Sequence, residues 1–132
     1  MTFDPRTIAT PIYDALNDLH SLANQDDTRL KQQKSQSVEL YTYLSTWGMM
    51  RLKAEEMALP DKTMMGKKEV VKKFFECLQA ISEKQNLSGQ QGLETLKKLD
   101  TDEYLGLTGL GLALAQEFSF WATAIYSDIK GE

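Results

Sequence analysis

The feature that most constrains the fold is a long apolar stretch at residues 104–129, near the end of the 132-residue chain. Apolar side chains recur there at steps of three or four, which is the spacing of one face of an α-helix. This face contains Leu107, Leu110, Leu114, Phe118, Trp121, Ile125 and Ile129, and it is widened by Leu112, Ala115, Phe120 and Ala122. A helix with so wide an apolar face needs several other helices to cover it.

A membrane span is the alternative reading of this stretch, since a bilayer is crossed by roughly 20 apolar residues. Gln116 and Glu117 lie at its middle, where a charged residue costs about 3 kcal/mol on insertion scales. Gly106, Gly109 and Gly111 lower its helix propensity. We therefore expect a core helix and no membrane association, with the three glycines allowing another helix to pack closely.

The first half of the chain contains two helical patterns. Thr10 and Pro11 resemble a cap followed by a first helical residue, so we expect a lead-in over residues 1–9 and a helix from Pro11 to about residue 24. Residues 24–27 predict a turn, after which Thr28 is placed to cap a helix. Pro60 requires that helix to end by residue 59. The pattern leaves open one long helix or two, broken near Ser35.

The second half predicts three more helices. Residues 67–84 are strongly amphipathic, residues 93–99 form a short apolar pattern, and acidic residues at 100–103 suit the positive end of a helix dipole at the start of the last helix. Alternation of period two and hairpin turn signals are missing from the sequence. It therefore predicts an all-α fold, a single-domain helical bundle of about five helices over residues 1–132.

The composition excludes several kinds of site. Cys77 is the only cysteine, which rules out an internal disulfide and a cysteine-based metal cage. His20 is the only histidine, which rules out multi-histidine metal sites and leaves any Ser-His-Asp mechanism dependent on one residue. A catalytic motif is not recognisable, so we expect no enzyme activity, cofactor or small-molecule substrate. The single cysteine and the absence of a signal-peptide pattern favour a cytoplasmic location.

Basic residues concentrate in one segment of this acidic chain. Residues 29–73 contain ten Lys and Arg against five Asp and Glu, whereas the flanks contain five basic and fourteen acidic residues. Phosphate favours such groups, especially where helix N-termini offer free N–H donors, and nearby aromatic rings are able to stack on bases. The predicted nucleic-acid-binding residues are Arg29, Lys31, Lys34, Arg51, Lys53, Lys67, Lys68, Lys72 and Lys73. The alternative is a solvated helix face.

Two stretches resemble the small subunits of class 1 CRISPR effector complexes of the type III or type I-D-like kind. Residues 41–56, YTYLSTWGMMRLKAEE, form a helix rich in Tyr and Met that contains a glycine. In residues 102–125, DEYLGLTGLGLALAQEFSFWATAI, an acidic residue and a tyrosine precede a Leu-Thr step and a long apolar helix.

The resemblance implies a non-catalytic subunit of a ribonucleoprotein. Its copies would stack along the other subunits, and their basic faces would hold the target or displaced strand beside the guide RNA. The family has no motif that assigns a role to individual residues, so the basic residues above are nominated on charge alone. The alternative function is a helical protein-binding adaptor with no nucleic-acid role, whose interface would be the Met-rich segment 49–65.

Overall fold

The computed structural model describes residues 5–129 and confirms an all-α fold, with six helices and no strand in that range. The helices are α1 (Arg6–Leu22), α2 (Asp27–Trp47), α3 (Met49–Ala58), α4 (Met65–Ser82), α5 (Gly92–Lys98) and α6 (Thr101–Ile125). Residues 1–4 of the expected lead-in, and residues 130–132 at the end of the expected domain, lie outside the described part.

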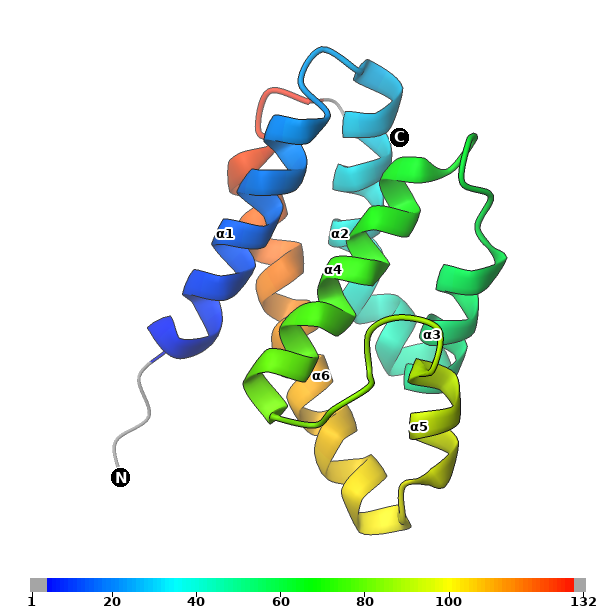
Figure 1. Ribbon diagram of the computed structural model, residues 1–132. Helices are drawn as coiled ribbons and strands as arrows, with labels where there is room; N and C mark the ends of the chain where they lie inside the picture. Colours follow the sequence, from blue (N-terminus) through cyan, green and yellow to red (C-terminus); the bar gives the residue numbers. More distant parts are fainter. Residues whose placement is uncertain (1–4, 130–132) are drawn as a thin grey trace.

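Four helices form a bundle, in which α1 and α6 run opposite to α2 and α4 (Figure 1). The short helices α3 and α5 pack against each other beside one end of this bundle. Helix α6 contacts α1, α2 and α4, so the most apolar helix is covered from several sides as the sequence predicted. The buried apolar side chains of these helices form one hydrophobic core.

Helix α6 begins with a capping box. The Asp100 carboxylate accepts a hydrogen bond from the Glu103 backbone N–H at 2.8 Å, and the Glu103 side chain accepts one from the Asp100 N–H at 3.3 Å. Leu114 and Phe118 are fully buried, but Phe120 is 60% exposed, so its assignment to the buried face was wrong. Among residues 5–129, no helix is long and apolar enough to cross a membrane.

The glycines of α6 differ in their surroundings. A Cβ at Gly111 would lie 2.6 Å from Cε of Met49, so the missing side chain allows α6 to approach the start of α3. A Cβ at Gly106 or Gly109 would meet no atom within 4 Å. The expectation of close helix packing is therefore confirmed at Gly111 and wrong at the other two positions.

The first two helices begin at residues that the sequence did not indicate. Helix α1 starts at Arg6, five residues before Pro11, because a proline inside a helix removes a single N–H donor and apolar packing compensates for it. Helix α2 is capped by Asp26, whose carboxylate accepts a hydrogen bond from the Arg29 N–H at 3.1 Å. The predicted cap, Thr28, lies inside the first turn.

The long central pattern is two helices, and they are separated at Gly48. This residue has φ +87°, a conformation that glycine adopts without steric cost, and it ends α2 after Trp47. The chain remains helical through Ser35, where a break was considered. Helix α3 ends at Ala58, as Pro60 requires.

Candidate nucleic-acid interface

The nine predicted basic residues are spread over the bundle. Helices α2 and α4 start at the same end of the molecule, which brings Arg29 close to the first turns of α4 and their lysines (Figure 1). Arg51 lies at the start of α3, next to the opposite end of α2. Most of the predicted residues therefore gather near the shared start of α2 and α4. Arg51 and Lys53 lie apart from them on α3.

Arg29 connects the two helices at that shared start. Its Nε donates to Glu69 Oε1 at 2.9 Å and its Nη2 donates to Glu69 Oε2, a bidentate pair. Gln33 Nε2 adds a hydrogen bond to Glu69 Oε1 at 3.0 Å. The hydrogen bonds that Arg29 donates to Glu69 raise the pKa of the guanidinium. Because this guanidinium is already matched to a carboxylate, its role in the fold is to hold α2 against α4.

Lys53 does not fit the prediction of an exposed binding residue. Its side chain is 1% exposed, its Nζ lies 2.9 Å from Glu56 Oε1, and it sits 4.6 Å from the centre of the Phe75 ring. The backbone of Gly92 packs against its stem, since a Cβ there would lie 2.3 Å from Lys53 Cε. A phosphate group cannot reach this ammonium without local unfolding.

Most of the remaining predicted lysines have partners at the surface. The contacts are Lys31 to Asp27 at 3.1 Å, Lys68 to Asp61 at 3.0 Å, Lys73 to Glu76 at 3.5 Å and Lys34 Nζ to the Ile129 carbonyl at 2.5 Å. Exposed ion pairs contribute about 0–1 kcal/mol, so a phosphate is able to replace the carboxylate in the first three. These lysines are accessible but not free.

Besides Lys34, three predicted residues have no carboxylate partner within residues 5–129. Lys72 is exposed and Lys67 is half-buried on α4, and neither ammonium makes an ion pair with residues 5–129. The Arg51 guanidinium lies 4.5 Å from the centre of the Trp47 ring, which is 51% exposed. The hydroxyl of Tyr43 donates to the Arg51 carbonyl at 3.3 Å, and burial raises the pKa of that hydroxyl. These contacts hold a cation over an aromatic face that is open to solvent.

A hollow between the end of α3, the connector and the first turns of α4 contains both signs of charge. Its volume is about 320 Å³, and it is lined by Glu56, Asp61, Met65, Lys68, Glu69 and Lys72. Carboxylates outnumber ammonium groups there, so the hollow itself is a poor phosphate site. Lys62, which the sequence prediction omitted, is exposed in the connector before α4. Its position within the basic segment 29–73 is the sequence signal that indicates it.

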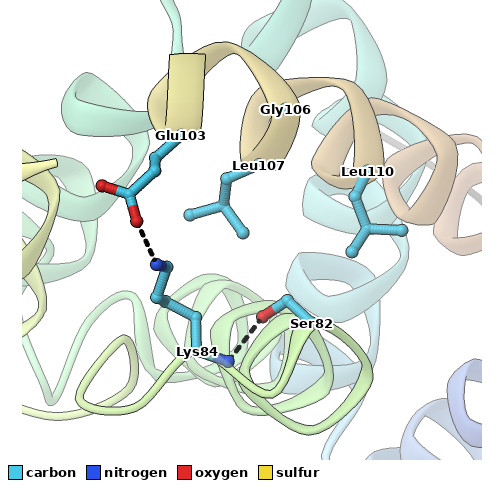
Figure 2. A pocket seen from close by; sticks show the side chains of 6 residues that line it. All are labelled: Ser82, Lys84, Glu103, Gly106, Leu107 and Leu110. Carbon is cyan, nitrogen blue, oxygen red and sulfur yellow. Dashed lines mark hydrogen bonds and ion pairs between the residues drawn. The ribbon is translucent and has the colours of Figure 1, made fainter. Parts of the chain in front are cut away.

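Figure 2 shows a second hollow, of about 290 Å³, where α4 ends and α6 begins. Lys84 Nζ donates to Glu103 Oε2 at 2.8 Å, and the Lys84 N–H donates to Ser82 Oγ at 3.1 Å. The hydrogen bond from Lys84 lowers the pKa of the Glu103 carboxyl. Gly106 has no side chain to occupy this space, and Leu107 and Leu110 form the apolar side of the hollow. The site thus offers an already neutralised ion pair beside an apolar wall.

The single histidine and cysteine are part of the packing. The half-buried His20 ring meets Tyr126 edge to face, with the ring centroids 5.1 Å apart. Cys77 is buried, which raises the pKa of its thiol to about 11. Across residues 5–129, no three His, Cys, Asp or Glu side chains gather closely enough to hold a metal ion.

Comparisons with protein-family models, curated proteins and solved structures find no match for this chain. The exposed groups described above are therefore the structural observations from which a function is proposed.

Proposed function

We propose that this chain is a non-catalytic small subunit of a class 1 CRISPR ribonucleoprotein effector complex, located in the cytoplasm. In this role it holds a target or displaced nucleic-acid strand and bridges neighbouring subunits. The groups that meet the strand are Arg51 with Trp47 at one end of the bundle, and Lys67 and Lys72 at the other. Lys62, Lys31, Lys68 and Lys73 supplement them.

The observation that carries the proposal is the Arg51–Trp47 pair. Proteins that bind single strands combine cationic groups, which meet phosphates, with aromatic faces, on which bases stack. Arg51 and Trp47 supply both within 4.5 Å, at the solvent-exposed end of α2. Trp47 is 51% exposed, so its ring is accessible to a base of a single strand.

The packing of the two resembling stretches also supports the proposal. The Tyr104 hydroxyl accepts a hydrogen bond from the Met50 N–H at 3.2 Å, which joins the start of α3 to the start of α6. Gly111 allows Met49 to pack against α6 about two turns further along the helix. Residues 41–56 and 102–125 therefore form one continuous packed unit, as expected of stretches that belong to a common domain.

The test is binding of a labelled single-stranded RNA to the purified full chain at low salt. Trp47→Ala should weaken binding by about 1–3 kcal/mol if one base stacks on the ring. Lys67→Glu/Lys72→Glu should weaken it for any sequence and reduce the salt slope by about 1.4, which corresponds to two phosphate contacts. Lys97→Glu/Lys98→Glu, at two exposed lysines of α5 outside the nominated set, makes the same change of charge and is the control. Unchanged binding by both test variants rejects the proposal.

The second candidate function is a protein-binding adaptor, which is favoured by the exposed methionines. Met57 is 61% exposed and Met65 is 43% exposed, whereas Met49 is fully buried. The adaptor interface would therefore centre on Met57 and Met65. Met57→Ala/Met65→Ala should then abolish binding to a co-purified protein, while the Lys67→Glu/Lys72→Glu variant keeps it.

A further inference from the structure

An open groove lies between α2 and α6, away from the groups that are proposed to contact the strand. Its volume is about 690 Å³. The lining residues are Val38, Tyr41, Thr42, Gln116, Glu117, Ser119, Phe120 and Thr123. Apolar side chains on both helices face this space, and polar groups accompany them along its length.

Ser119 lies in the groove, where α6 meets α2. The Ser119 hydroxyl donates to the carbonyls of Ser37 at 3.2 Å and of Val38 at 3.1 Å, so α6 approaches α2 closely at this point. Phe120 and Val38 remain 60% and 37% exposed beside it. The groove is open, and exposed apolar side chains border the point where the two helices meet. The apolar face of an amphipathic helix packs on such a surface.

Aromatic rings extend the apolar surface from the groove towards α1. Phe120 meets Trp121 edge to face with centroids 5.1 Å apart, and Trp121 meets Tyr13 in the same manner at 5.6 Å. Tyr13 is 43% exposed. Aromatic side chains are enriched at the centres of protein interfaces, where they lose little conformational entropy on binding.

Charge identifies the chemistry of the occupant. Trp121 Nε1 donates to Glu117 Oε1 at 3.1 Å, which fixes this half-buried carboxylate at the groove, and no Lys or Arg of residues 5–129 pairs with it. Residues 99–129 contain five acidic and no basic residues, and residues 35–50 contain Glu39 as their only charged residue. The nearest lysine on α2, Lys34, donates to the Ile129 carbonyl. A half-buried, unpaired carboxylate favours a cationic partner.

We propose that this groove binds an amphipathic, basic helix of a protein partner. Apolar side chains of that helix enter beside Phe120 and Val38, and a Lys or Arg of that helix pairs with Glu117. This inference does not depend on the nucleic-acid assignment, because the groups proposed to contact the strand lie outside the groove. The inference concerns a protein partner, and it states that the segment of this partner that enters the groove is a basic amphipathic helix.

The test uses a labelled amphipathic peptide of Leu and Lys, about 18 residues or five helical turns long, and a matched peptide of Leu and Glu. Fluorescence anisotropy with the full chain should show binding of the Leu/Lys peptide and at least tenfold weaker binding of the Leu/Glu peptide. Phe120→Ala and Glu117→Gln should each weaken binding at least fivefold. Leu105→Ala removes another exposed side chain of α6, 62% exposed, and should change binding less than twofold.

Circular dichroism of each variant verifies that the helices are retained. The proposal is overturned if the Leu/Lys peptide does not bind, if the acidic peptide binds equally well, or if Phe120→Ala binds like the wild type. It is also overturned if the wild-type chain sediments as a dimer and Phe120→Ala sediments as a monomer, because the occupant is then a second copy of this chain.

Discussion

Replacing Lys53 by methionine separates the two roles considered for this residue. The substitution keeps most of the unbranched stem against Gly92 and Phe75 and removes the ammonium that lies 2.9 Å from Glu56 Oε1. The Glu56 side chain is 12% exposed, so the change leaves a largely buried carboxylate without its partner. If Lys53 were a surface residue that meets nucleic acid, the same change would scarcely affect stability.

The expected loss can be calculated from the burial of the pair. Removing one partner of a buried ion pair costs about 3–5 kcal/mol, and the remaining exposure of Glu56 favours the lower end, about 3 kcal/mol. An unfolding entropy of about 2.1 cal/mol/K per residue gives roughly 0.28 kcal/mol/K for this chain, so Tm should fall by about 11 °C. Lys53→Met/Glu56→Gln removes both charges and should remain within about 1 kcal/mol of the wild type.

Guanidinium unfolding followed by tryptophan fluorescence measures the free energies, and calorimetry measures Tm. The reasoning is refuted if Lys53→Met loses less than about 1 kcal/mol and the double variant is no more stable than the single one. That result would put the Lys53 ammonium in water, where it is available to a phosphate.

Three further predictions concern packing and titration. Gly109→Ala should stabilise the protein by about 1 kcal/mol through helix propensity, whereas Gly111→Val should destabilise it by about 1–3 kcal/mol through overpacking; thermal unfolding of both variants compares them. Cys77, with its pKa raised to about 11 from 9.0, should carry about a hundredfold less thiolate near pH 8 than an ordinary thiol, so Ellman's reagent should label it at the rate of protein opening; rapid labelling of the native chain would contradict its burial. The lowered pKa of Glu103 means that its ionised form stabilises the fold above its unfolded pKa of about 4.3, and that this contribution is lost as pH falls through the folded value. Glu103→Gln should therefore flatten the acid side of the stability profile, and an unchanged profile would show that the hydrogen bond from Lys84 has no effect on stability.

Helix periodicity predicted the fold class because it reports directly which residues one helix buries. The acidic start of α6 and the end of α3 before Pro60 were also visible, since capping and proline chemistry are local. The break at Gly48 and the start of α1 before Pro11 were not, because tertiary packing decides whether a glycine bends a chain and whether a helix tolerates a proline.

The candidate interface was less predictable than the fold. Arg29 pairs with Glu69, forty residues away, and the sequence has no local pattern that reports such a contact. In the sequence Lys53 is one charge among several, and its burial depends on how α3 meets α4 and the start of α5. The sequence therefore identified the basic segment. Which of its Lys and Arg side chains are accessible is decided by the packing of the helices.

Purification of the tagged full chain from its native host, with sequencing of the bound RNA and identification of the bound proteins, tests the proposed function most directly. We predict short RNAs that share a repeat-derived end, together with larger backbone subunits, and loss of the RNA from the Trp47→Ala or Lys67→Glu/Lys72→Glu variants at raised salt. A single protein partner without RNA would contradict the nucleic-acid assignment and would favour the adaptor function.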